Sequence, residues 1–441
     1  MIAGGGDRVV VLDPVVGPEL VTGSTRLKSG TATKICLEVV IITAMGYVIA
    51  EAEDPPSDSF GLIATARGLV RGLVSSMAAG SGARAGFVVP SLLEKYEKCL
   101  KIFGKSMSLL NPFEIDSHPL SIGAATLRMG GRIAYAGIGR EGLLGLVDAS
   151  EQLPTFGCQE TDFQGFLLDR ALPEEVVEVV GEERGVARFQ TTMASFGPND
   201  TIVLILNLRR LARTRAWVAE ASAAATALFE SQESKGETHR SKVVSLVAVP
   251  RTLAKNATLS SFLDQIIDKS DSVIDIYLDD DDELAPSLGA DYDLGAEIGI
   301  KCALNCFSSG CNVLNGKVYG NVMIDVRISN KKLLERAISI VTGVAEVDRA
   351  VAFDSVMRAL GLRKFCGAER LRQEEDLREC IEHGSGLRKV VPTAVLLATG
   401  RYATPEEARG ALGKLTQGGS SVGGRRTLRD IIKDSIARKI I

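Results

Sequence analysis

Residues Arg132–Glu151, RIAYAGIGREGLLGLVDASE, decide the fold class of this 441-residue chain. The apolar run RIAYAG is typical of a short buried strand, and Gly137 and Gly139 lead it into a helical segment that contains LLGLVDASE. A strand, glycines and a helix in this order are expected of an α/β domain that binds a nucleotide or a sugar phosphate.

The flanking segments extend this pattern in both directions. Further strands are predicted at TIVLILNL (201–208), KVVSLVAVP (242–250) and SVIDIYL (272–278). Helices are predicted at PLSIGAATLRMGG, in an alanine-rich stretch from about 209 to 230, and from Ile298 onward. Alternating strands and helices predict a doubly wound parallel sheet with helices on both faces. The later segments, such as TPEEARGALGKL, are helical and charged.

The composition restricts the class of protein. A hydrophobic content of 45% suits two or three domains with sizeable cores, and a formal net charge of −4 argues against a generic nucleic-acid surface. Eight cysteines occur without a CxxC pair or a signal peptide, which favours a reducing compartment; we expect the cytoplasm, with the nucleus as the alternative. With three histidines, we expect no metal and no cofactor. The longest apolar stretch, 39–50, is too short to span a bilayer, so no membrane is expected.

A second informative stretch is Gly17–Lys34, GPELVTGSTRLKSGTATK, which leads into a predicted apolar helix. Glycines and hydroxyls let backbone N–H groups approach an anion, and fixed cations add positive charge. The candidate ligand-binding residues are Gly23, Ser24, Thr25, Arg26, Lys28 and Lys34. The alternative is a polar loop that caps a buried helix.

This stretch resembles the signature of the sugar isomerase (SIS) domain proteins that include N-acetylmuramic acid 6-phosphate etherases and glucokinase regulatory proteins. Asp148–Gly157, DASEQLPTFG, is similar to the etherase motif with the proposed catalytic acid, which places that acid at Glu151. Gly316–Leu333, GKVYGNVMIDVRISNKKL, is similar to the segment that closes the SIS domain in both families. The three matches are separate and follow the same order.

The resemblance also implies a division of the chain. IAGGGDR at 2–8 resembles a strand end of a first SIS domain, but VVVLDPVVGPE follows almost at once, where the families have a longer segment. We expect residues 1–60 to be the remnant of a first SIS domain, through which two chains could pair. Residues 61–85 would be an insertion or linker, 86–345 a second SIS domain and 346–441 a C-terminal helical lid. A lost coding segment and a degenerate paralogue both explain the short first part.

An internal similarity supports a tandem origin, because KICLEVVI from Lys34 aligns loosely with KCALNCFS from Lys301. In the regulatory proteins the corresponding lysine of the second domain contacts a fructose phosphate. The resemblance thus makes Lys301 a ligand contact, while the alternative is a lysine that extends its stem over apolar surface to reach solvent.

Etherase chemistry needs an acid for the lactyl ether oxygen and a base for the α proton. Glu151 matches the acid, but the motif of the base is missing, and Glu182 or Glu183 is suggested only by proximity in sequence. After TIVLILNL the chain reads RRLART instead of a Ser/Gly-rich turn. The resemblance therefore implies a non-catalytic inhibitor of a hexokinase-type partner, a glucokinase, that responds to fructose 6-phosphate and fructose 1-phosphate. The alternatives are an etherase-like lyase and a degenerate scaffold that binds no sugar.

Overall fold

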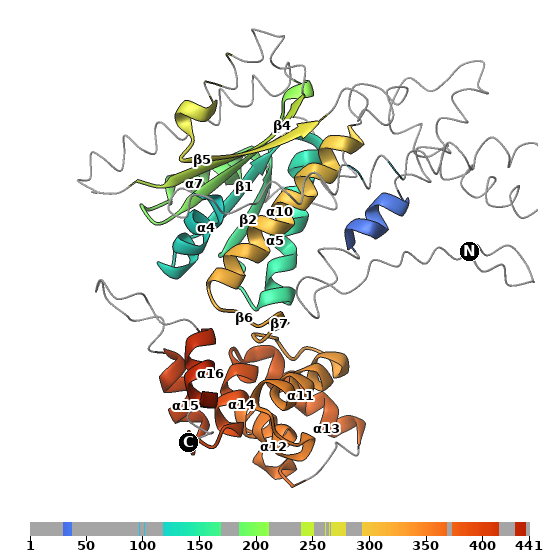
Figure 1. Ribbon diagram of the computed structural model, residues 1–441, viewed down its shortest axis with the longest axis vertical. Helices are drawn as coiled ribbons and strands as arrows, with labels where there is room; N and C mark the ends of the chain where they lie inside the picture. The colour runs from blue at the N-terminus through green and yellow to red at the C-terminus, as the bar shows by residue number, and fades with distance from the viewer. Residues whose placement is uncertain are drawn as a thin grey trace, which may run out of the picture.

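The computed structural model combines a sheet domain with a helical unit at one end of it (Figure 1). It describes residues 30–37, 97, 101, 118–168, 185–210, 240–250, 261, 264, 266–278, 293–367, 373–413 and 428–437. None of the helices in these ranges combines the length and the apolar composition that a membrane span requires.

The sheet domain is built on five parallel strands in the order β2-β1-β3-β4-β5. Their bounds are β1 Ile133–Gly137, β2 Phe163–Leu167, β3 Thr201–Asn207, β4 Lys242–Pro250 and β5 Ser272–Leu278. The register aligns the last residue of β1, Gly137, with Leu167 of β2 and with Ile205 of β3. The fold class predicted from the sequence, a doubly wound parallel sheet flanked by helices, is confirmed.

Alternate side chains of each strand enter two separate cores, as a period of two requires. Tyr135, Ile205 and Leu246 pack with α5 and α10 on one face. Ala136, Leu204 and other strand residues pack with Phe189 of α7 on the opposite face. The inner strands β1, β3 and β4 are therefore buried on both sides, which explains why they read as continuous hydrophobic runs.

The helices of the sheet domain begin at residues that suit a helix start. Their bounds are α4 Pro119–Arg128, α5 Gly139–Phe156, α7 Val186–Ala194 and α10 Leu294–Leu314, and a 3-10 helix, η3, spans Leu208–Arg210. The imidazole of His118 accepts a hydrogen bond from the Leu120 amide at the start of α4, and Pro119 is its first residue. Asp293 caps α10 in the same way through the amide of Ala296. Residues 30–37 are also helical.

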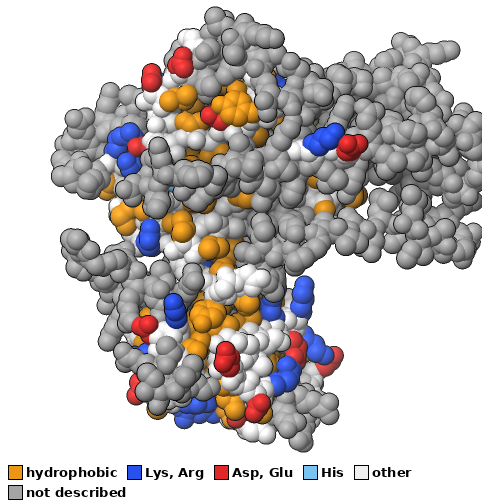
Figure 2. Space-filling view, viewed as in Figure 1, with side chains coloured by type: hydrophobic (Ala, Val, Ile, Leu, Met, Phe, Trp, Pro, Cys, Tyr) orange, Lys and Arg blue, Asp and Glu red, His pale blue; other side chains and the backbone are white. Residues whose placement is uncertain are grey.

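A short antiparallel pair, β6 Val318–Tyr319 and β7 Val322–Met323, leads into the helical unit. Its helices are α11 Lys331–Ala345, α12 Arg349–Ala359, α13 Glu374–Gly386, α14 Val390–Ala398, α15 Pro405–Gly413 and α16 Leu428–Ala437, with the 3-10 helix η7 at Arg363–Phe365. Every residue of α14 is buried, because α11, α12, α15 and α16 pack around it. On the visible face of this unit, side chains of both charges are interspersed (Figure 2).

Three predicted strands and the strand at RIAYAG are present, but β2 was missed. The helical unit begins at α11, before the boundary at residue 346 that we expected from the sequence; the four-part division of the chain stays a prediction. The expected first-domain remnant is described only at 30–37, while the expected linker, the alanine-rich helix beyond 210, and Glu182 and Glu183 lie outside the described residues.

Candidate functional site

The strand order points to the carboxyl ends of β1 and β3 as the place for a ligand. These strands are neighbours, and the helix that follows β1 (α5) and the helix that precedes β3 (α7) lie on opposite faces of the sheet, which makes the carboxyl ends of β1 and β3 the topological switch point where ligands of α/β sheets bind. Charged and amide side chains meet there, and we call them the switch-point cluster: Lys34, Arg140, Glu141, Asn207, Arg209, Asp293 and Glu297.

A close backbone approach positions the β1 side of this cluster. Gly137 ends β1, and a Cβ on Gly142 of α5 would lie 2.5 Å from the carbonyl carbon of Gly137 and 2.6 Å from its oxygen. Gly139 between them has a φ of 60°, which favours glycine. These glycines hold the first turn of α5 tightly against the strand end, so that Arg140 reaches Glu297 and Glu141 reaches Asn207.

Asn207, the last residue of β3, joins two buried carboxylates. Its Nδ2 donates to Oε1 of Glu141 at 2.8 Å and to Oδ2 of Asp293 at 3.1 Å. Its Oδ1 accepts from the backbone N–H of Arg209 at 3.0 Å, and the guanidinium of Arg209 lies 3.3 Å from Oδ1 of Asp293. The amide therefore satisfies both carboxylates with one NH₂ group, and Arg209 neutralises one of them.

Glu297 in the first turn of α10 is the second centre of the cluster. Its side chain is 2% exposed and pairs with Lys34 at 2.9 Å and with Arg140 at 2.5 Å. A negative charge in the first turn is also favoured by the helix dipole. This ion pair connects helix 30–37, drawn in blue beside α10 in Figure 1, to the sheet domain.

The cluster contains three cations, Lys34, Arg140 and Arg209, and three acids, Glu141, Asp293 and Glu297, so its formal charges cancel. An entering phosphate would have to compete with carboxylates for each of these cations. Sugar hydroxyls, in contrast, can donate to the carboxylates without displacing a cation. The described residues include no group of three or more histidines, cysteines or acids placed to hold a metal ion.

Glu151 lies about three turns after Arg140 and Glu141 on α5, where a polar seam joins this helix to α10. Ser308 donates to Oδ1 of Asp148 at 3.1 Å, and Asn312 donates to Oε1 of Gln152 at 3.2 Å. Asp148 and Gln152, the α5 residues of this seam, are buried, whereas Glu151 is half-buried. The seam aligns α5 and α10 side by side in the same direction.

The same alignment separates Glu151 from Lys301. Lys301 precedes Ser308 by seven residues, and Glu151 follows Asp148 by three. At 1.5 Å per residue the two side chains begin about 15 Å apart along the helix pair. They lie on adjacent helices but do not share one small site within this domain.

Lys34 and Lys301 lie at the same end of α10. Lys34 pairs with Glu297, and Lys301 lies one turn after Glu297 on the same helix. The two lysines of the internal similarity therefore lie close to one carboxylate. The other predicted N-terminal ligand residues, Gly23, Ser24, Thr25, Arg26 and Lys28, lie outside the described residues.

Sequence reasoning missed most of the switch-point cluster. Asn207 ends an apolar strand, and Asp293 and Glu297 lie at the start of an apolar helix, so each carried a local signal: a polar residue at a strand end or helix start. That signal becomes specific only when the strand order brings these ends together.

The C-terminal part of the chain, residues 320–416, matches the family described as the C-terminal lid domain of glucokinase regulatory protein. This match covers α11 to α15 and agrees with the predicted helical lid.

Curated relatives come from two groups. An N-acetylmuramic acid 6-phosphate etherase of Thermosynechococcus vestitus is 33% identical over 235 residues, which is 53% of this chain and 66% of the relative. One from Gloeobacter violaceus is 29% identical over 64% of this chain and 82% of the relative. The glucokinase regulatory protein of Rattus norvegicus is 25% identical over 401 residues, which is 88% of this chain and 53% of the relative. The chain spans about half the length of the regulatory proteins it matches.

Proposed function

Because the chain is related to two SIS-domain families, the glucokinase regulatory proteins and the N-acetylmuramic acid 6-phosphate etherases, we propose that it is a carbohydrate-phosphate-binding regulator that inhibits a hexokinase-type partner. The observation that carries this proposal is the family match of the C-terminal helical unit. The family match at residues 320–416 is to the lid domain of the regulatory proteins.

The chemistry of the switch-point cluster supports a binding protein. The turn after β3 is the 3-10 helix Leu208–Arg210, whose Arg209 pairs with Asp293, in place of a Ser/Gly-rich phosphate loop. The carboxylates suit the hydroxyl groups of a sugar, and the phosphate would be held by Lys301 together with the N-terminal residues Gly23–Lys28 and Lys34. The ligand would then lie between the N-terminal part of the chain and the start of α10.

Regulation follows from differential binding. The resemblance points to fructose 6-phosphate as the ligand that favours the inhibitory conformation and to fructose 1-phosphate as the one that opposes it. Each ligand can shift the equilibrium only by its difference in affinity for the two conformations. We propose that this takes place in the cytoplasm, with the nucleus as a second compartment.

The second candidate function is an etherase-like lyase. It is favoured by the higher identity to the bacterial etherases and by Glu151, which lies half-buried on α5 at the position of the proposed acid. It needs a base near Glu151. The nearest acid on the same helix, Asp148, is already hydrogen-bonded to Ser308 and Gln152, which makes it a poor base.

Thermal unfolding of the full chain with sugar phosphates tests the proposal, because a ligand that binds only the folded state raises Tm. We expect fructose 6-phosphate and fructose 1-phosphate to raise Tm, and the rise to disappear in Lys301→Ala. The matched control is Lys332→Ala, which removes an exposed lysine at the start of α11 and should keep the full rise.

The other outcomes separate the alternatives. A rise in Tm with N-acetylmuramic acid 6-phosphate that is lost in Glu151→Gln would replace the regulator by the lyase. An unchanged Tm with all three compounds would contradict sugar phosphate binding by this chain and leave the scaffold as the explanation.

A further inference from the structure

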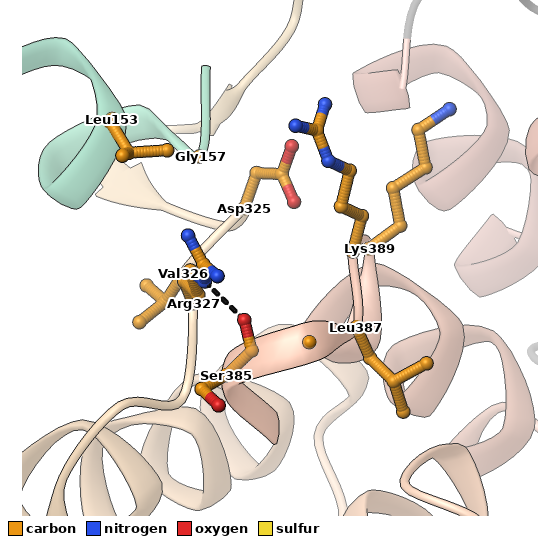
Figure 3. Close-up of a pocket in the computed structure, with 10 residues that line it drawn as sticks. Leu153, Gly157, Asp325, Val326, Arg327, Ser385, Leu387 and Lys389 are labelled. Atoms are coloured by element: carbon orange, nitrogen blue, oxygen red, sulfur yellow. Dashed lines mark hydrogen bonds between the residues drawn. The ribbon is translucent and has the colours of Figure 1, made fainter. Parts of the chain in front are cut away.

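A cavity of about 180 Å³ lies where the sheet domain meets the helical unit. Its walls come from the end of α5, from the segment after β7, and from the connection between α13 and α14 (Figure 3). At about 30 Å³ per water molecule the cavity has room for about six waters. None of the residues that line it belongs to the switch-point cluster.

The charged residues that line this cavity are Asp325, Arg327, Arg388 and Lys389. Nε of Arg327 donates to the carbonyl oxygen of Ser385 at 2.5 Å, and Nζ of Lys389 donates to that of Leu412 at 3.4 Å. Within the described residues, the exposed Arg388 makes no hydrogen bond or ion pair. The cavity thus has one cation available for a ligand and two more that are fixed in its wall.

Asp325 adds a carboxylate, a hydrogen-bond acceptor, to the cations that line the cavity. Figure 3 shows its carboxylate between the segment after β7 and the loop that carries Lys389. In the part of the chain that the structure describes, this carboxylate has no hydrogen bond and no ion pair within 4.0 Å. Burial raises the pKa of Asp325, although Lys317, Lys389 and Arg388 act in the opposite direction.

A half-buried cation, Lys317, lies behind Asp325. Nζ of Lys317 donates to the carbonyl oxygen of Phe156 at 3.0 Å and contacts Sγ of Cys158 at 3.3 Å. Burial alone would lower the pKa of Lys317, but Cys158, Asp325 and Asp162 raise it, so this lysine stays charged. The lining of the cavity therefore carries three cations against one carboxylate, and this excess of positive charge favours an anion.

The backbone conformation of Lys389 is also unusual. Lys389 has a φ of 56°, a left-handed conformation that is strained for a lysine and that occurs at ligand clamps. It is also the N-cap of α14, where no side chain caps the helix. The positive end of the α14 dipole therefore borders the cavity.

We propose that this cavity binds a small anionic polyol, a phosphorylated or carboxylated compound with free hydroxyl groups. The anionic group pairs with Arg388 at the start of α14, and a hydroxyl group of the same molecule donates to Asp325. Because the wall includes Gly157 at the end of α5 and Ser385 at the end of α13, the bound molecule connects the sheet domain to the helical unit. It is an effector site separate from the proposed sugar phosphate site.

Calorimetric titration of the full chain with glycerol 3-phosphate tests this proposal, with inorganic phosphate and glycerol as probes of each half of the ligand. We expect saturable binding of glycerol 3-phosphate that is at least 10-fold tighter than that of inorganic phosphate, and none of glycerol. Arg388→Gln should weaken it at least 10-fold. Arg363→Gln, which removes an exposed arginine on η7 outside the cavity, should leave it unchanged.

Asp325→Asn provides an independent readout of the hydroxyl contact. Removing this negative charge should tighten binding of inorganic phosphate while reducing the preference for glycerol 3-phosphate over phosphate. A saturable affinity that Arg388→Gln and Arg363→Gln reduce equally, or the absence of saturable binding, would overturn the proposal. Because these probes do not involve Lys301, this result is independent of the response to fructose phosphates.

Discussion

Replacing Glu297 by glutamine is expected to lower the free energy of unfolding by about 3 kcal/mol, because it removes the buried partner of two cations. Glu297 is 2% exposed, whereas its partners Lys34 and Arg140 are 17% and 37% exposed. The change keeps the shape of the side chain and removes only its charge. Loss of one member of a buried pair costs about 3–5 kcal/mol, and the partial solvation of both cations places this case at the lower end.

Urea denaturation at neutral pH measures this effect, with Glu335→Gln as the matched control. Glu335 pairs with Arg349 on the surface, where both side chains are about half exposed, and the control should cost less than about 1 kcal/mol. A loss of stability in Glu297→Gln no larger than in Glu335→Gln would show that the pair does not hold helix 30–37 to the sheet domain.

Gly142→Ala is expected to lower the free energy of unfolding by about 3 kcal/mol, because the added methyl group has no space. It would meet the backbone carbon and oxygen of Gly137 at 2.5 and 2.6 Å, and backbone atoms cannot turn aside as a flexible side chain can. Overpacking costs about 1–3 kcal/mol or more, and the upper end applies when α5 itself must move. The movement would also pull Arg140 and Glu141 out of the switch-point cluster.

Gly343→Ala is the matched control, read out by the same denaturation experiment. Gly343 lies on the exposed side of α11, where an added Cβ meets nothing within 4 Å. Alanine in place of glycine within a helix should raise the free energy of unfolding by about 0.5–1 kcal/mol. Equal effects of the two substitutions would contradict the close approach of α5 to β1.

The sequence allowed much of the sheet to be predicted, because β1, β3 and β4 are apolar runs and β5 alternates apolar side chains with Asp275 and Tyr277. The strand β2 is FQGFL, in which Gln164 and Gly165 interrupt the apolar pattern. Gly165 is there because a Cβ would lie 2.4 Å from Cα of Leu146 on α5. The close packing of α5 on β2 therefore requires a glycine at this position, and glycine is not one of the residues that favour a strand.

The candidate site was harder to predict than the fold, because its contacts join distant parts of the chain. Lys34 was singled out as an anion-binding residue, but its partner Glu297 lies 263 positions away. The local sequence pattern shows which charged residues lie at the start of a helix or the end of a strand. It does not show that Asn207 pairs with Asp293, because that contact depends on the strand order. The resemblance to known families supplied Glu151 and Lys301, and nothing local indicated that these two lie far apart.

Inhibition of a glucokinase by the purified full chain tests the central claim most directly. The account predicts that the chain lowers the rate of glucose phosphorylation, that fructose 6-phosphate strengthens this inhibition, and that fructose 1-phosphate relieves it. Lys301→Ala should abolish the response to both fructose phosphates, while Lys332→Ala retains it. A glucokinase rate that is unchanged by the chain with and without either fructose phosphate would contradict the account.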